Sequence, residues 1–171
     1  MRRLGRNHYE RAFESWLIDN AIEYIAIDEH KKTVFGRSKI KSFDYLLYKK
    51  DGQAVTAEVK GRKFKGTSFE KLTGLECWVT IDDIEGLSGW QSVFGTGSTA
   101  VFVFAYEAEK PDVDFDGRGA YEFDSNRYVF FCIRLADYVL AMKPRSGKWR
   151  TVTLAAEDFR RYAVRIERFL L

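Results

Sequence analysis

The sequence predicts a single α/β domain over residues 1–171, with a central mixed β-sheet flanked by α-helices. Three features predict this class. Apolar residues near the start recur at helical spacing, a continuous apolar run over residues 99–107 is typical of a strand buried on both faces, and shorter strand-like segments lie between them. The apolar content of 46% and the aromatic content of 16% exclude a disordered chain.

The first part of the chain predicts one helix followed by strands. Apolar residues from Tyr9 to Leu17 keep helical spacing, and Asn7 is a suitable N-cap. The segments that follow are short and rich in residues that favour strands. We expect these strands at residues 23–28, 32–36, 43–49 and 53–64.

The second part predicts helices and strands in alternation. Residues 82–94 favour a helix, although Gly86 and Gly89 are unfavourable inside one. The apolar run over residues 99–107 is expected at the centre of the sheet. The remaining expected elements are a strand hairpin turning at residues 124–126, a short helix within residues 136–142 and an amphipathic helix over residues 155–171.

Two of the expected strands, residues 43–49 and 53–64, carry acidic side chains among apolar ones. A two-residue turn at Asp51-Gly52 would set Asp44 opposite Val59 and mix polar with apolar side chains on both faces. A three-residue turn at residues 50–52, with Gly52 in the left-handed conformation, sorts the two faces correctly. The apolar pairs are then Phe43 with Val59, Tyr45 with Ala57, and Leu47 with Val55, while Asp44 meets Glu58 on the other face.

Such a pair of carboxylates would be unfavourable alone. Directly opposite residues have Cβ atoms about 4.5–5.5 Å apart, and like charges at that distance repel. A divalent cation between Asp44 and Glu58, or protonation of one of them, relieves the repulsion. Carboxylate oxygens suit Mg²⁺ or Mn²⁺, and Lys60 is placed to hold an anion or a water beside the metal. The alternative is a solvated strand face on which Lys60 neutralises Glu58 and Asp44 is merely exposed.

The same residues resemble the core motif of the PD-(D/E)XK nuclease superfamily, an Asp on one strand followed by (Asp/Glu)-x-Lys on the next. Here the motif is Asp44 and then "EVK" at residues 58–60, with Phe43 in place of the Pro before the Asp. The resemblance implies a restriction-endonuclease-like core and metal-dependent hydrolysis of phosphodiester bonds in DNA. It also implies that Mg²⁺, or Mn²⁺, is bound by Asp44, Glu58 and the backbone carbonyl of Val59, and that Lys60 orients or helps to deprotonate the attacking water.

The resemblance extends to the first helix. The segment "ERAFESWL" is similar to the first helix of archaeal Holliday-junction resolvases, in which a Glu stands seven residues before a Leu, as Glu10 does before Leu17. At about 100° per residue, Glu10 lies about 90° from the centre of the apolar stripe and Glu14 about 130°, so Glu10 leans over the sheet more easily. Glu10 is therefore a candidate catalytic and metal-supporting residue. The alternative is an exposed charge that favours the helix N-terminus.

Other candidates depend on the same resemblance. The family often places a further Gln or Lys on the helix after the motif, which makes Gln91 a candidate, although it can equally be a surface residue. Basic residues surround the two strands, and they form either a rim around a polyanion site or an ordinary solvated surface. If the rim is functional, the residues that contact DNA phosphates in a salt-sensitive way are Arg62, Lys63, Lys65 and Lys41.

Other kinds of site find no support. The two His and two Cys match no metal or disulfide pattern, and residues 82–83 and 112–116 match no calcium loop. The aromatic residues Trp78, Trp90, Trp149 and Tyr128 are candidates for base stacking, although such aromatics more often fill a core or a dimer contact. The sequence contains no apolar run of membrane-spanning length and no signal-peptide pattern, so we expect a cytoplasmic protein.

The sequence therefore predicts a Mg²⁺-dependent endonuclease that acts on DNA. Small domains of the family often pair, so a homodimer is one option. Two other readings stay open. One is a catalytically inactive nucleic-acid-binding module on the same fold, and the other is an interaction domain in which the two close carboxylates are incidental.

Overall fold

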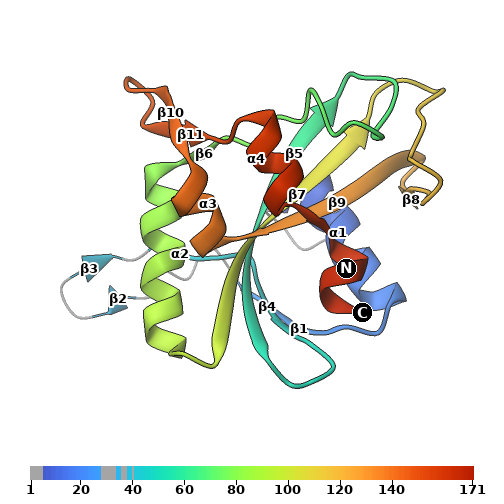
Figure 1. Cartoon of the computed structure of the whole chain (residues 1–171). Coiled ribbons are helices and arrows are strands. Elements are labelled where there is room, and N and C mark those ends of the chain that lie inside the picture. Colours follow the sequence, from blue (N-terminus) through green and yellow to red (C-terminus); the bar gives the residue numbers. More distant parts are fainter. Residues whose placement is uncertain (1–5, 28–33, 36–37, 40) are drawn as a thin grey trace.

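The computed structural model describes residues 6–27, 34–35, 38–39 and 41–171. Its main sheet has the strand order β1-β4-β5-β7-β9-β12, with β8 added beside β9 (Figure 1). β5 and β7 run parallel and the other neighbouring strands antiparallel, which confirms a mixed sheet. The strands are β1 (Glu23–Ala26), β4 (Tyr45–Tyr48), β5 (Ala54–Phe64), β7 (Ser98–Ala108), β8 (Tyr121–Phe123), β9 (Asn126–Arg134) and β12 (Val164–Arg165).

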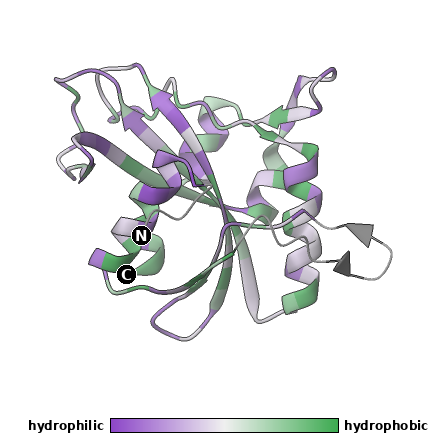
Figure 2. Cartoon of the chain, turned by 180° about the vertical axis from the view of Figure 1, so that it is seen from behind, coloured by the Kyte–Doolittle hydropathy of each residue, from purple (hydrophilic) through white to green (hydrophobic). Residues whose placement is uncertain are grey.

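Helices cover both faces of this sheet (Figure 1). α1 (His8–Asp19) and α5 (Ile166–Leu170) pack on one face, and α2 (Ile81–Phe94), α3 (Leu135–Ala141) and α4 (Ala156–Tyr162) pack on the other. β7 lies between β5 and β9 and alternates its apolar side chains between the two cores, as the sequence predicts for a central strand. Hydrophobic residues accordingly run along the strands of the sheet in Figure 2.

The β4–β5 hairpin has the predicted three-residue turn. Gly52 adopts a left-handed φ of 84°, and the Lys49 N–H donates to the Gln53 carbonyl at 3.0 Å. Tyr45 pairs with Ala57 and, further along, Leu47 with Val55. The apolar pattern therefore selected the correct register.

The prediction is wrong for Phe43. Its ring packs against Trp90 of α2, with ring centroids 5.2 Å apart, whereas Val59 belongs to the core under α1. The reason is that β4 begins at Tyr45, so the alternation of a paired strand does not extend back to Phe43. The Asp44 N–H donates to the Ala57 carbonyl at 3.1 Å, which closes the ladder at that point.

α2 forms as predicted in spite of its glycines. Thr80 is its N-cap and makes a capping box with Asp83. Gly86 lies so close to the segment before β4 that a Cβ at this position would be 2.9 Å from the Lys41 Cβ. The indole N–H of Trp90 donates to the Lys41 carbonyl at 2.8 Å. The glycine thus lets residue 41 approach the helix closely.

The predicted helix over residues 155–171 is wrong. α4 ends at Tyr162, β12 pairs with β9 at the sheet edge, and α5 follows. Phe159 is buried in the core under α2, whereas Ile166 is buried in the core under α1. The chain therefore crosses from one face of the sheet to the other, which a continuous helix could not do.

The described residues also form two small sheets. β10 (Lys143–Ser146), β11 (Thr151–Thr153) and β6 (Val79–Thr80) form a three-stranded sheet whose hairpin the sequence analysis did not predict. β2 (Val34–Phe35) pairs with β3 (Ser38–Lys39). Part of the strand expected at residues 32–36 and the end of that expected at 23–28 lie outside the described residues.

Candidate active site

A cleft of about 430 Å³ lies where β5 runs past the end of β4. The β4–β5 ladder ends at Tyr45 and Ala57, whereas β5 continues to Phe64. The start of α1 and the segment before β4 close the cleft. All four predicted catalytic residues line it, in a set that comprises Asn7, Tyr9, Glu10, Lys41, Asp44, Glu58, Val59, Lys60, Gly61 and Arg62.

Gly61 allows α1 to approach β5 at this point. A Cβ on Gly61 would lie 2.1 Å from the ring of Tyr9, so the ring packs directly on the strand backbone. The Tyr45 hydroxyl also donates to the carbonyl of Glu10 at 3.1 Å. These two contacts bring the first turn of α1 to the edge of the cleft that Lys60 lines.

Asp44 is held at the end of the ladder. It is 5% exposed, and its Oδ2 accepts a hydrogen bond from the Val59 N–H at 2.6 Å. Because β4 does not pair with β5 beyond Ala57, the carboxylate takes the place of a strand carbonyl for this N–H. Asp44 and Glu58 therefore share the cleft without forming the regular cross-strand pair that the sequence predicted.

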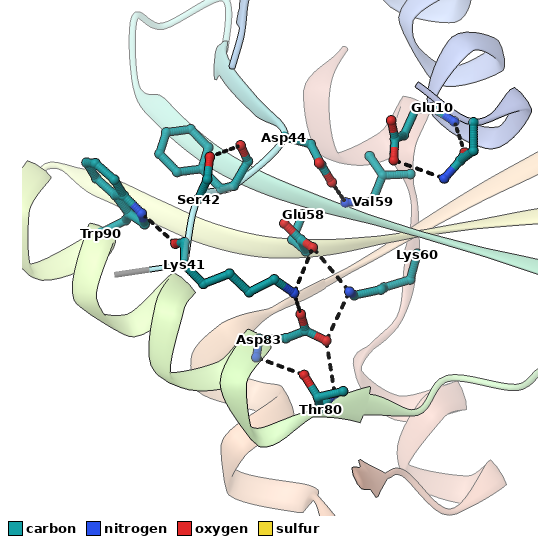
Figure 3. Close-up of polar contacts among 12 residues, drawn as sticks. Glu10, Lys41, Ser42, Asp44, Glu58, Val59, Lys60, Thr80, Asp83 and Trp90 are labelled. Carbon is teal, nitrogen blue, oxygen red and sulfur yellow. Dashed lines mark hydrogen bonds and ion pairs between the residues drawn. The ribbon is translucent and has the colours of Figure 1, made fainter. Parts of the chain in front are cut away.

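Glu58 lies beside two lysines. It is 7% exposed, and its Oε1 makes ion pairs with Lys60 at 3.1 Å and with Lys41 at 3.8 Å (Figure 3). Burial raises the pKa of Glu58 above its ordinary value, and the charges of the two lysines act against that rise. The burial of Asp44 and Glu58 contradicts a merely solvated strand face, although the expected Lys60–Glu58 ion pair is present.

A third acid, Asp83 at the start of α2, belongs to the site but was not predicted from the sequence. Its side chain is 1% exposed, its Oδ2 lies 2.9 Å from the Lys60 ammonium, and its Oδ1 pairs with Lys41. The Thr80 N–H donates to the same carboxylate at 2.9 Å. Burial alone would raise the pKa of Asp83, but the charge of Lys60 and the hydrogen bonds from Lys41 and Thr80 outweigh it and lower the pKa to about 2.

Glu58, Lys60, Asp83 and Lys41 thus form a closed ring in which acidic and basic side chains alternate (Figure 3). We refer to these four residues as the charge ring. Two carboxylates and two ammonium groups cancel in formal charge, and each carboxylate contacts both lysines. The ring explains how the protein tolerates nearly buried acids here.

The oxygen donors of the cleft suit a small divalent cation. Mg²⁺ is commonly held by one or two carboxylates, and waters or substrate phosphates complete its shell. Asp44 and Glu58 line the cleft together with Val59, whose backbone carbonyl would complete such a set. Within the part of the chain that the structure describes, no three His, Cys, Asp or Glu side chains form a ready metal-binding group. Glu10 accepts a hydrogen bond from the Asn7 amide at 3.0 Å, so its support of a metal stays a prediction.

The predicted phosphate-binding residues differ in their surroundings. Arg62 donates to the carbonyls of Gly61 and Trp78, and its guanidinium lies 4.1 Å from the centre of the Trp78 ring. Burial lowers the pKa of Arg62. Lys63 and Lys65 are exposed at the end of β5 and just beyond it.

Two further predicted residues lie in different positions. Lys41 is part of the charge ring. Gln91 lies in the second half of α2 and is not among the described residues that line the cleft. Phosphate binding by Lys41 and the participation of Gln91 in the site stay predictions.

The mixed central sheet with helices on both faces defines an α/β fold. Among solved structures, the chain is similar to Hjc, a Holliday junction resolvase from the archaeal hyperthermophile Archaeoglobus fulgidus. The TM-score is 0.55 at 15% sequence identity, over 95% of this chain and 98% of that chain. At this identity the likeness is one of fold alone.

Neither a protein-family model nor a curated protein matches the sequence. Among the described helices, none is both long and apolar enough to cross a membrane.

Proposed function

We propose that the chain is a Mg²⁺-dependent endonuclease that hydrolyses phosphodiester bonds in DNA, and a divergent member of the PD-(D/E)XK superfamily. One observation carries the proposal. The Lys60 ammonium lies between two nearly buried carboxylates, Glu58 and Asp83, in a cleft that also contains the carboxylate of Asp44. The likeness in fold to a Holliday junction resolvase supports the same reading.

The residues divide the work between binding and catalysis. Asp44, Glu58 and the Val59 carbonyl would hold Mg²⁺ or Mn²⁺, with Glu10 in support. When bound, the cation polarises a phosphoryl oxygen and lowers the pKa of a bound water. Lys60 would orient the attacking water and offset the negative charge that develops on the phosphate, an electrostatic effect worth about 3 kcal/mol in comparable sites.

Asp83 would act through Lys60. Its carboxylate fixes the ammonium from the side of α2, while Glu58 contacts it from within β5. A lysine held by two anchored carboxylates has fewer accessible rotamers, so it loses less conformational entropy when the substrate binds. Lys63 and Lys65, exposed near the end of β5, would bind phosphates further along the DNA backbone.

A second candidate function has one observation in its favour. Lys41 and Lys60 already neutralise Glu58 without a metal ion, which suits a nucleic-acid-binding module that has lost turnover. The two candidates differ in what a metal does, because the binding module does not need one. A cytoplasmic location and a homodimer stay predictions from the sequence.

Thermal unfolding with and without Mn²⁺, in the wild type and in Asp44→Ala, separates these functions. For the nuclease we expect Mn²⁺ to raise the Tm of the wild type but not of the variant, and we expect cleavage of labelled DNA. Salt-sensitive DNA binding without cleavage or a Mn²⁺ response would instead indicate the binding module. If the wild type shows neither a Mn²⁺ response nor DNA binding, both proposals fail and an interaction domain is left.

A further inference from the structure

The β10–β11 hairpin, residues 143–153, is a basic arm that projects from the molecule beyond the start of α2 (Figures 1 and 2). It carries four basic residues and no acidic one. All four are exposed: Lys143, Arg145, Lys148 and Arg150. Such a density of one charge on a projecting element favours a polyanionic ligand.

Trp149 lies in the turn of this arm and is 68% exposed. Its backbone N–H donates to the Ser146 hydroxyl at 3.3 Å, and the Lys148 ammonium lies 5.1 Å from the centre of its ring. A ring this exposed contributes little to the core, and single exposed apolar residues are common in proteins. An indole among basic side chains is, however, the combination with which proteins stack bases and bind the adjoining phosphates.

The arm is connected to the cleft. Arg145 lies 4.9 Å from the centre of the Trp78 ring, and Arg62, which lines the cleft, lies 4.1 Å from the centre of the same ring. Arg62, Trp78 and Arg145 therefore link the cleft to the stem of the arm.

The backbone fixes this placement. β11 pairs with β6 through Thr151 and Thr80, and Thr80 is the N-cap of α2 that contacts Asp83. Arg150 is partly neutralised, since it lies 3.3 Å from Asp82 and near Glu85 on α2. Both pairs are exposed and therefore weak. The charge that the arm offers to a ligand thus comes mainly from Lys143, Arg145 and Lys148.

We propose that the arm is a second nucleic-acid contact, in which Lys143, Arg145 and Lys148 bind phosphates and Trp149 stacks on an unpaired base. The choice of DNA as the ligand rests on the proposed function. The contact itself needs no catalysis, so it can be tested without cleavage. It also indicates a preference for DNA that combines duplex with unpaired nucleotides.

The test measures binding of the full chain to fluorescein-labelled DNA in EDTA, using a blunt duplex and the same duplex with a single-stranded tail. We expect Trp149→Ala to weaken binding of the tailed duplex by about 5- to 150-fold, the range for loss of one stacked base, and to leave the blunt duplex within about twofold. The matched control is Leu140→Ala, since Leu140 is also an exposed apolar residue, at 75%.

The charges are tested with a triple variant, Lys143→Gln, Arg145→Gln and Lys148→Gln. We expect it to weaken binding of both DNAs and to reduce the slope of log K against log salt by about 2–3, because three phosphate contacts are lost. The control triple, Lys50→Gln, Lys110→Gln and Arg160→Gln, removes the same charge from exposed positions elsewhere. All variants should keep the wild-type Tm within a few degrees, as expected of surface changes.

The outcomes separate this inference from the proposed function. If binding depends on the arm but the wild type does not cleave DNA, the arm is a nucleic-acid contact and the nuclease proposal is wrong. If the wild type cleaves DNA and both arm variants bind DNA as tightly as the wild type does, the arm is not a nucleic-acid contact and the nuclease proposal stands. Absence of DNA binding by the wild type, or arm-dependent binding to phosphatidylserine vesicles in place of DNA, overturns the arm as a nucleic-acid contact.

Discussion

Asp83→Asn is the most direct test of the charge ring. Asn has nearly the same shape as Asp and keeps a carbonyl that can accept from the Thr80 N–H, so the variant removes the charge and spares the cap. Its cost can be worked from the pKa of Asp83, which measures how much the folded state favours the charged carboxylate. Lowering the pKa of Asp83 from its ordinary 3.8 to about 2 corresponds to about 2 kcal/mol of stability at neutral pH. In a chain of this size we expect the Tm to fall by about 4–8 °C.

The pH dependence gives a second measure of the same effect. Because the pKa of Asp83 is lower in the folded state than in the unfolded state, its contribution is complete above about pH 4 and is lost as the pH falls toward 2. The difference in free energy of unfolding between wild type and Asp83→Asn should therefore be constant from pH 7 to about 5 and shrink below about pH 4. Urea unfolding across this range measures it.

The matched control is Asp82→Asn on the same first turn of α2. The Asp82 side chain is 66% exposed and lies 3.3 Å from Arg150, so its removal should cost less than about 1 kcal/mol. Both variants lose one negative charge near the helix N-terminus, and the comparison isolates the contacts with Lys41 and Lys60. Equal stability of the two variants at pH 7 would refute the charge ring as a stabilising feature.

Three further predictions concern the cleft. Lys60→Ala should reduce DNA cleavage by about 100-fold or more while keeping the Mn²⁺-induced rise in Tm, and undiminished cleavage would remove Lys60 from the mechanism. Gly61→Ala should lower stability by about 1–3 kcal/mol in urea unfolding, because the new methyl overlaps the ring of Tyr9, and wild-type stability would contradict that packing. EDTA should leave the Tm of the purified protein unchanged, since lysines neutralise Glu58; a large fall would show that the fold depends on a metal.

Local patterns predicted most of the sheet. The β4–β5 turn could be predicted because the strand alternation and Gly52 together allow one register. The apolar run of β7 likewise identified the central strand. The structure of residues 155–171 could not be predicted, because helical spacing cannot show that Phe159 and Ile166 lie on opposite faces of the sheet. The pattern is the same whether the helix continues or breaks.

Three of the four predicted catalytic residues are close in sequence, and the fourth, Glu10, was added from the family resemblance and its angle on the first helix. Glu58 and Lys60 lie on one strand, and Asp44 lies just before its hairpin partner. Asp83 joins them through the packing of α2 on β5, a contact between distant parts of the chain that periodicity does not reveal. A local signal did exist, since Thr80 and Asp83 have the spacing of a capping box and place Asp83 in the first turn of a helix.

The charge ring also changes the argument that led from the sequence to a metal. Two acids on neighbouring strands required compensation, and a cation was the simplest source of it. In the structure Lys41 and Lys60 supply that compensation for Glu58, and the Val59 N–H contributes it for Asp44. Acid repulsion by itself therefore no longer implies a metal. What still favours one is that Asp44 and Glu58 line one cleft together with Val59 and Lys60, because folding alone does not require that arrangement.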